Sequence, residues 1–311
     1  MHTPTQPGPA PHAGSGTPHW TVGEATVHRI DETPLPPETG RWLLPGATAD
    51  LVEQQEWLRP DFADQGVLRA DSHSFAIRTG GLRVLVDTGI GNGKQRANPA
   101  WHDLDTPYLD RLTRAGFPPD SVDLVILTHL HTDHVGWNTH WSAAAGAWVP
   151  TFPRARHLTS RTEWDFWRGQ EREMDEPRRQ MFRDSVLPVA DAGLLDPLDV
   201  PDDGLEIAPG LSLLPTPGHT PGHLAVRLHS AGATALITGD CVHHPVQLAH
   251  PGIGSCVDID PARAEATRRA LFSSLAGTDT LLLGTHFAPP TAGHVVRDAD
   301  AYRLLPSAPR G

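Results

Sequence analysis

One short segment constrains this chain more than any other feature of its sequence. An almost wholly apolar run, residues 123–128, is followed at once by four potential metal ligands: His129, His131, Asp133 and His134. The run predicts a buried strand, and a strand end is a rigid place from which to present ligands. Side chains alternate along an extended segment, so His129 and His131 can reach one ion, and Asp133 and His134, beyond a bend, can face a second. We therefore expect a two-metal site here rather than a histidine-rich surface loop.

Two metals need further ligands from elsewhere in the chain, and three candidates lie at the ends of other predicted strands. His219 stands in a segment that contains Pro-Gly-His twice, while Asp240 and His286 each end an apolar run. Imidazole and carboxylate ligands suit Zn²⁺ best and are also accepted by Mn²⁺, Fe²⁺ and Co²⁺. Cys241 adjoins Asp240, but neighbouring side chains on a strand point apart, so we interpret Cys241 as a small buried apolar residue.

Composition excludes several other classes of protein. The chain has 25 Lys and Arg against 37 Asp and Glu, a net charge of −12, which argues against a nucleic-acid or anionic-membrane surface. Its two cysteines are too few for a disulfide framework or a cysteine-based zinc module. No apolar run approaches the roughly 18 residues that cross a bilayer, and we expect neither signal peptide nor anchor. We expect a cytoplasmic protein with a small-molecule substrate, and a homodimer is left open.

The order of the predicted elements indicates how the chain is organised. Residues 1–19 are rich in Pro and Gly and predict a flexible tail, followed by one domain over residues 20–311. Strands are expected at 25–30, 74–78, 83–87, 123–128, 211–214, 224–228, 234–238 and 280–283, and helices at 107–116, 161–183 and 260–277. Ser160 and Glu163 form a capping box for the second helix, and a loop covers 137–152. Each half of the chain is expected to contain strands followed by a helix. This order predicts an α/β fold of two sheets packed face to face, with helices outside.

The ordered motifs, Asp87, the His129 cluster, His219, Asp240 and His286, resemble those of the metallo-β-lactamase superfamily. The resemblance implies an αβ/βα four-layer sandwich with two mixed sheets and the site along one edge of both. It also implies a division of the ligands: His129, His131 and His219 for the first metal, Asp133, His134 and His286 for the second, and Asp240 as the bridge.

Residues around the ligands carry weaker signals. The resemblance implies that Asp87 supports the ligand loop by hydrogen bonds without binding metal. His223 is interpreted either as a similar support or as a merely structural residue, and the same alternatives hold for His243 and His244. An apolar substrate pocket could be lined by Trp137, Trp164, Trp167 and Phe287, although these aromatic residues could equally pack a helix onto the sheet.

A two-metal site of this kind predicts hydrolysis by a bridging hydroxide, without a serine or cysteine nucleophile. Asp240 would hold both ions, and Asp133 would also shuttle the proton. Within the superfamily the chain is most similar to the branch of methyl parathion hydrolase and the quorum-quenching lactonases, by its motifs at 86–89, 134–136, 217–223 and 286–294. The resemblance implies an activated ester as substrate, either a lactone like an acyl homoserine lactone or an aryl phosphotriester, and the aromatic residues predict an apolar substituent on it.

Three alternatives stay open at this stage. A thioesterase of the glyoxalase II type would carry a basic C-terminal cluster, whereas here only scattered arginines remain at 297, 303 and 310. The same ligands could also hold a single iron ion, as in enzymes related to sulfur dioxygenases. A non-catalytic metal-binding module is the third alternative, although the complete ligand set argues against it.

Overall fold

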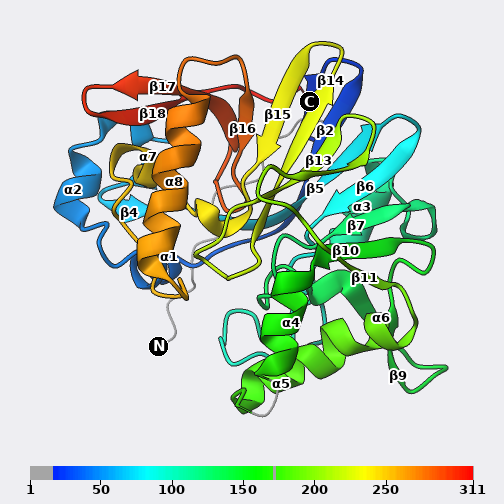
Figure 1. Ribbon diagram of the computed structural model, residues 1–311. Coiled ribbons are helices and arrows are strands. Elements are labelled where there is room, and N and C mark those ends of the chain that lie inside the picture. Colours follow the sequence, from blue (N-terminus) through cyan, green and yellow to red (C-terminus); the bar gives the residue numbers. More distant parts are fainter. Residues whose placement is uncertain (1–16, 171–172, 311) are drawn as a thin grey trace, which may run out of the picture.

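Two seven-stranded mixed sheets form the centre of the structure, a computed structural model that describes residues 17–170 and 173–310 (Figure 1). In the first sheet the strands lie in the order β1 (His19–Val22), β2 (Ala25–Pro34), β5 (Asp71–Thr79), β6 (Leu82–Val86), β7 (Leu124–Ile126), β10 (Arg156–Ser160) and β11 (Leu195–Leu198). In the second sheet the order is β12 (Leu205–Ala208), β13 (Leu211–Pro215), β14 (Leu224–Ser230), β15 (Ala233–Ile237), β16 (Leu281–Leu283), β17 (Ala292–Asp298) and β18 (Ala301–Pro306). Two short hairpins, β3 (Ala63–Asp64) with β4 (Val67–Leu68) and β8 (Thr139–Ser142) with β9 (Ala147–Pro150), lie outside these sheets.

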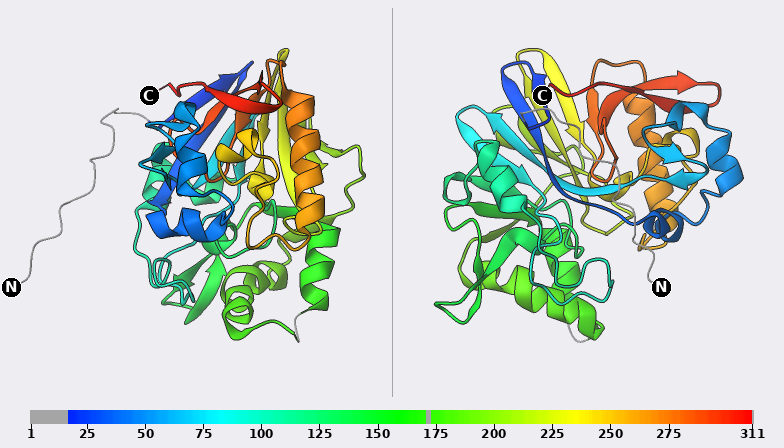
Figure 2. Two further views of the ribbon diagram at one scale, coloured as in Figure 1. Left: turned by 90° about the vertical axis from the view of Figure 1, so that its left-hand side faces the viewer. Right: turned by 180° about the vertical axis from the view of Figure 1, so that it is seen from behind.

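Helices cover the outer face of each sheet (Figure 2). The first sheet is covered by α3 (Tyr108–Arg114), α4 (Arg161–Gly169), α5 (Glu176–Met181), a π-helical turn (Phe182–Val186) and α6 (Leu187–Asp191). The second is covered by α1 (Pro37–Leu43), α2 (Ala49–Glu53), α7 (Val246–Ala249) and α8 (Pro261–Leu275). The expected face-to-face sheets with helices outside are confirmed. No helix in the described part of the chain combines the length and apolar character needed to cross a lipid bilayer.

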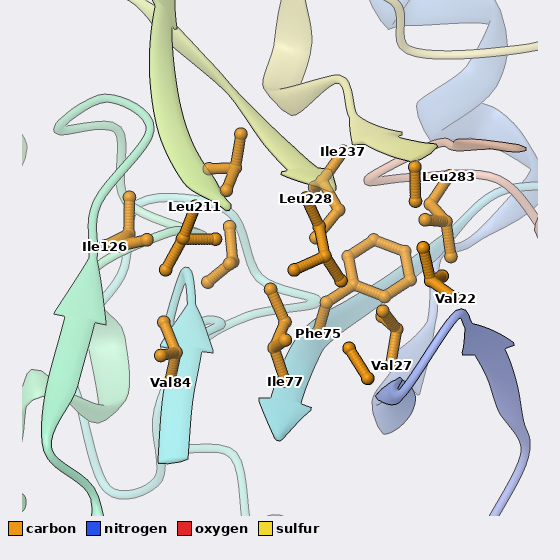
Figure 3. Packing of buried hydrophobic residues seen from close by; sticks show 14 of the residues in the cluster. Val22, Val27, Phe75, Ile77, Val84, Ile126, Leu211, Leu228, Ile237 and Leu283 are labelled. Atoms are coloured by element: carbon orange, nitrogen blue, oxygen red, sulfur yellow. The ribbon is translucent and has the colours of Figure 1, made fainter. Parts of the chain in front are cut away.

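Apolar side chains fill the space between the two sheets (Figure 3). Along β5, Phe75 and Ile77 point into this central layer, whereas Ala76 between them points to the helices on the other face. Along β15, Ile237 likewise faces the centre and Leu236 faces α8. Both faces of these two strands are thus buried, which is why such central strands appear in the sequence as largely apolar runs.

The topology brings the ends of the ligand-bearing strands to one edge. β6 and β7 are parallel, and so are β15 and β16. β13 and β15 both run antiparallel to β14, so they point in the same direction as each other. The carboxyl ends of β13, β15 and β16 therefore share one edge of the second sheet. A backbone hydrogen bond from Leu224 N to Thr128 O, 2.9 Å long, joins this edge to the end of β7 in the first sheet.

Three expectations about elements need comment. The long helix over 161–183 is wrong: α4 ends at Gly169 and a new helix begins at Glu176, because Asp175 caps it and Pro177 has no N–H for a continuous helix. The loop over 137–152 is partly wrong, since it contains the hairpin β8–β9. Of the predicted tail, residues 1–16 lie outside the described residues, and β1 begins at His19.

A buried ion pair fastens the segment between β6 and α3 to the π-helical turn. The Arg96 guanidinium donates to the two carboxylate oxygens of Asp184 at 2.8 and 2.9 Å. Lys94 Nζ lies 3.6 Å from Asp184 Oδ1 and donates to Thr139 Oγ1 at 2.7 Å. Burial lowers the pKa of Lys94 to about 7, with Asp184 acting in the opposite direction. Two buried basic side chains thus share a single carboxylate.

Candidate metal centre

Three imidazoles meet at the shared edge of the sheets to form a first cluster. His219 Nε2 lies 3.2 Å from His129 Nε2 and 3.0 Å from His131 Nδ1. Burial, reinforced by the neighbouring imidazoles, lowers the pKa of all three well below the ordinary value for histidine. Neutral nitrogens are what a metal ion requires. These are the three residues expected at the first metal.

A second cluster contains the three residues expected at the second metal. His134 Nε2 lies 3.7 Å from Asp133 Oδ1, and His286 Nε2 lies 3.6 Å from Asp133 Oδ2. The ligand atoms of this cluster, like those of the first, all lie within 4.8 Å of one another. Two candidate sites therefore lie side by side. The ligand segment after β7 contributes its first two ligands to one site and its last two to the other.

Asp240 lies between the two clusters. Its Oδ1 is 3.2 Å from His286 Nε2, and its Oδ2 is 3.2 Å from His134 Nε2 and 3.7 Å from His219 Nε2. Burial alone would raise the pKa of Asp240, but the surrounding imidazoles outweigh burial and hold this pKa well below the ordinary value. Asp240 is thus an ionised carboxylate that faces both clusters, in the position expected of a bridge.

The donor set fits a pair of divalent cations. Among the residues that the structure describes, His134 Nε2 and Asp240 Oδ1 are buried without a hydrogen-bond partner. Buried polar atoms are normally paired, and in the first cluster the ring nitrogens point at one another. Cations between these donors would satisfy all of them, and imidazole with carboxylate is a donor set that suits Zn²⁺.

Asp87 and His223 hold backbone and side chains of the site in place. Asp87 accepts hydrogen bonds from Thr128 N at 2.8 Å and Thr128 Oγ1 at 2.9 Å, and its Oδ2 lies 2.9 Å from His134 Nδ1. His223 Nε2 accepts from Asp240 N at 2.8 Å. Burial lowers the pKa of His223 to about 3, which keeps this ring neutral. The geometry suits the supporting role expected for Asp87 and the first of the two alternatives for His223.

The Metallo-beta-lactamase superfamily profile matches residues 68–286, a range that contains the two clusters, Asp240 and Asp87. The chain belongs to this superfamily. Among solved structures, AidC, described as a dizinc quorum-quenching lactonase, has a TM-score of 0.75 at 21% identity over 95% of this chain and 99% of that one. The hydrolase AbOPH has a TM-score of 0.76 at 22% identity over 96% and 99%. The expected metallo-β-lactamase fold is thereby confirmed.

Curated superfamily relatives include lactonases. The N-acyl homoserine lactonase AiiA of Bacillus thuringiensis subsp. kurstaki is 30% identical over 167 residues, covering 49% of this chain and 57% of the relative. The N-acyl homoserine lactonase AttM of Rhizobium radiobacter is 31% identical over 172 residues, covering 50% and 56%. The chain thus spans little more than half the length of these curated relatives.

One residue near this superfamily site had no signal in the sequence, and another, His243, had an ambiguous one. Asp258, in the loop before α8, has its Oδ1 2.9 Å from His219 Nδ1, so it orients that ring. It is far from the ligand motifs in the sequence, and only the folded structure brings it there. His243 Nε2 lies 3.4 Å from Asp240 Oδ2, and neither ring nitrogen has a hydrogen-bond partner among the described residues. Of the alternatives for His243, proximity to the metal site fits these contacts better than a structural role. His244 instead lies 2.8 Å from Phe62 O.

Cys241 points away from the ligands of this metallo-β-lactamase site, into the apolar layer beneath α8. Its thiol donates to Thr238 O at 3.1 Å, and burial raises the thiol's pKa to about 12. We therefore expect Cys241→Ser to leave metal content and kcat essentially unchanged and to cost only about 1 kcal/mol of stability. Elemental analysis, kinetics and urea unfolding of the variant check this. Loss of metal from the variant would identify the thiol as a ligand.

A cavity of about 480 Å³ opens onto the two clusters, and its floor is formed by His131, Thr132, Asp133, Asp240 and His286. Its walls are largely apolar and comprise Leu35, Trp42, Leu43, Trp101, Phe166, Trp167, Met181, Val257 and Ile259. These side chains come from helices α1, α4 and α5, from the segment just before α1, from the segment between β6 and α3, and from the loop before α8. The site therefore combines polar ligands at the bottom with an apolar entrance.

Of the four aromatic residues expected to line a pocket, only Trp167 does so. The Trp137 ring stacks on Tyr108 and its indole donates to Glu32 at 2.8 Å. Phe287 packs against Phe62 in the layer outside the second sheet. Trp164 lies beneath the Arg168 guanidinium, away from the cavity. The contacts of these three residues fit the packing alternative better than a place in the pocket wall.

Proposed function

We propose that this chain is a dinuclear metal-dependent hydrolase that opens a lactone, or cleaves a similarly activated ester such as an aryl phosphotriester, with an apolar substituent. The observation that carries the proposal is the position of Asp240 between two complete ligand clusters on the floor of an apolar cavity. The lactonase relatives support the same substrate class. A cavity of this volume suits a small-molecule substrate.

The ligand residues would bind two metal ions, and Asp133 would also transfer a proton. His129, His131 and His219 would hold one divalent ion, Asp133, His134 and His286 the other, and Asp240 both, with Zn²⁺ as the preferred metal. When bound, two such ions supply an activated water and polarise the carbonyl or phosphoryl oxygen of the substrate. The Asp133 side chain is 14% exposed against 5% for Asp240, and it lines the cavity. An Asp133 carboxylate oxygen can therefore hold a proton and pass it to the leaving oxygen.

The cavity wall favours an apolar substituent over a charged one. Trp42, Trp101 and Trp167 face the space above the ligands, and Arg178 is the one cationic side chain among the described lining residues. A glutathione thioester carries two carboxylates that would meet little positive charge here. The acyl or aryl part of an ester can instead gain about 0.8 kcal/mol for each CH₂ that it buries.

A direct test combines metal analysis with a substrate panel. We expect purified protein to contain about two metal ions per chain and to hydrolyse N-acyl homoserine lactones. Chelation should abolish this activity, and added Zn²⁺, Mn²⁺ or Co²⁺ should restore it. One iron ion with oxygen consumption on a persulfide would instead support a dioxygenase. Preference for an acyl-glutathione would support a thioesterase, and metal without activity on any of these substrates would contradict the proposal.

Trp42 provides a test of substrate preference, because its side chain lies at the cavity entrance and is 56% exposed. In the wild type, kcat/KM should rise with acyl chain length. Trp42→Ala should flatten this rise, with KM for a ten-carbon chain about tenfold higher and KM for a four-carbon chain nearly unchanged, since two CH₂ groups lose their contact. Trp141, 54% exposed on the hairpin away from the cavity, is the matched control. Equal effects of Trp42→Ala and Trp141→Ala would refute this assignment.

A further inference from the structure

Glu163 makes hydrogen bonds that its place at the start of a helix does not predict. In a capping box, the first residue's hydroxyl accepts from the fourth residue's N–H, and the fourth residue's carboxylate accepts from the first residue's N–H. The first half is present here, since Ser160 Oγ accepts from Glu163 N at 3.0 Å. The carboxylate turns elsewhere. Glu163 Oε1 accepts from Leu130 N at 3.1 Å, and Oε2 accepts from Gly222 N at 3.1 Å.

These two amides belong to the two loops that carry the first ligand cluster. Leu130 lies between His129 and His131 in the segment after β7, and Gly222 lies three residues after His219 in the loop between β13 and β14. The loops extend from different sheets. Glu163 is fully buried, and each of its two oxygens holds one loop.

The contact with the second loop is tight enough to depend on glycine. A Cβ on Gly222 would lie 2.1 Å from Glu163 N and 2.4 Å from Ser160 Oγ, which no side chain tolerates. Ser160 Oγ also donates to Gly222 O at 2.7 Å. Two side chains at the start of α4 therefore bind the backbone of Gly222, one at its N–H and the other at its carbonyl oxygen.

The same carboxylate also fixes a wall of the cavity. Trp167, one helical turn after Glu163, donates from its indole nitrogen to Glu163 Oε1 at 2.7 Å. Its ring lies edge-on to His131, with ring centroids 5.7 Å apart, and it lines the cavity. One buried side chain thus contacts both ligand loops and the aromatic residue above them.

We infer that Glu163 is a positioning residue, which sets the spacing of His129, His131 and His219 by holding both loops and which fixes Trp167 above His131. The inference rests on the proposed function, because it assumes that these three histidines bind metal. Its physical basis is that supporting groups one contact away from metal ligands typically contribute about 10–100-fold to metal affinity or activity.

The test compares Glu163→Gln with the wild type in zinc-loaded protein. The amide of glutamine keeps one acceptor oxygen, which can still hold one loop. Its NH₂ group is only a donor, so it cannot accept the hydrogen bond from the backbone N–H of the other loop, and that loop is released. We expect one of the two Zn²⁺ ions to pass to a chromophoric chelator about 10–100-fold faster, while the other keeps its wild-type rate. In the metal-free protein, hydrogen exchange at Leu130 or Gly222 should also be faster.

Glu32→Gln is the matched control. Glu32 is equally buried and accepts from Ile90 N, Gly91 N, Trp137 Nε1 and Ser72 Oγ, which lie outside the first cluster. It should lower stability without accelerating release of the first ion. Glu163→Asp, which is shorter by one CH₂ and can reach only one loop, serves if the Gln variant fails to fold.

The possible outcomes separate this inference from the proposed function. Wild-type protein that binds no zinc contradicts the proposed function itself. Wild-type protein with two ions, together with a Glu163→Gln variant that releases both at wild-type rates and keeps both amides protected, overturns the positioning role alone. Equal loss of the first ion from Glu32→Gln would also overturn it, because general destabilisation would then explain the result.

Discussion

Asp240→Ala is expected to lower kcat by more than about 100-fold while the fold persists. Asp240 is the carboxylate that faces both ligand clusters, and even supporting partners of metal ligands contribute about 10–100-fold. Its loss leaves the imidazoles of His134 and His286 facing each other without the negative charge between them. Kinetics on a lactone, elemental analysis and circular dichroism together measure activity, metal content and fold.

The neighbouring residue supplies the control for this experiment. Cys241→Ser changes the next side chain along the chain, which points into the apolar layer instead of the site. It should leave the measured activity close to that of the wild type. An Asp240→Ala protein that kept two metal ions and wild-type turnover would show that another group joins the two clusters.

Asp184→Ala is expected to lower the free energy of unfolding by about 3–5 kcal/mol, because it leaves Arg96 as a buried cation without its carboxylate and removes the carboxylate partner of Lys94. The π-helical turn that carries Asp184 follows α5, whose Met181 lines the cavity, so the loss should also disturb the entrance. Urea unfolding followed by circular dichroism measures the change.

Asp196→Ala is the control for the loss of an ion pair as such. Asp196 pairs with Arg156 at the surface, where the two side chains are 40% and 61% exposed. Exposed pairs contribute about 0–1 kcal/mol, so this variant should unfold close to the wild type. If Asp184→Ala also lost less than about 1 kcal/mol, the buried cluster would not be essential for stability.

The two candidate ligand clusters could be predicted from the sequence because their residues follow strong local signals. His129 to His134 follow an apolar run that becomes β7, and Asp240 and His286 follow the runs of β15 and β16. Short apolar runs between turn signals indicate buried strands, and the parallel pair β15–β16 places Asp240 and His286 at one edge of the second sheet.

The cavity walls could not be predicted in the same way. Trp42 lies in a short helix without a clear apolar period, and Trp101 lies in an irregular segment held by the ion pair of Arg96. Glu163 carried a recognisable capping signal, yet its carboxylate bonds to loops that are remote in sequence. Such contacts depend on how whole layers pack, and neither spacing nor residue type reveals them.

The division of the ligand atoms between two sheets links metal supply to the folding of the chain. His129 and His131 extend from the first sheet, while His219 extends from the second, so the first cluster exists only when the sheets are docked. An ion bound between the docked sheets binds the native state more tightly than the unfolded chain, and this difference in binding free energy adds to the free energy of unfolding. Each tenfold rise in free metal concentration above the dissociation constant would add about 1.4 kcal/mol per site. In a cell, scarcity of the metal would then lower the lifetime of the protein as well as the fraction of active molecules.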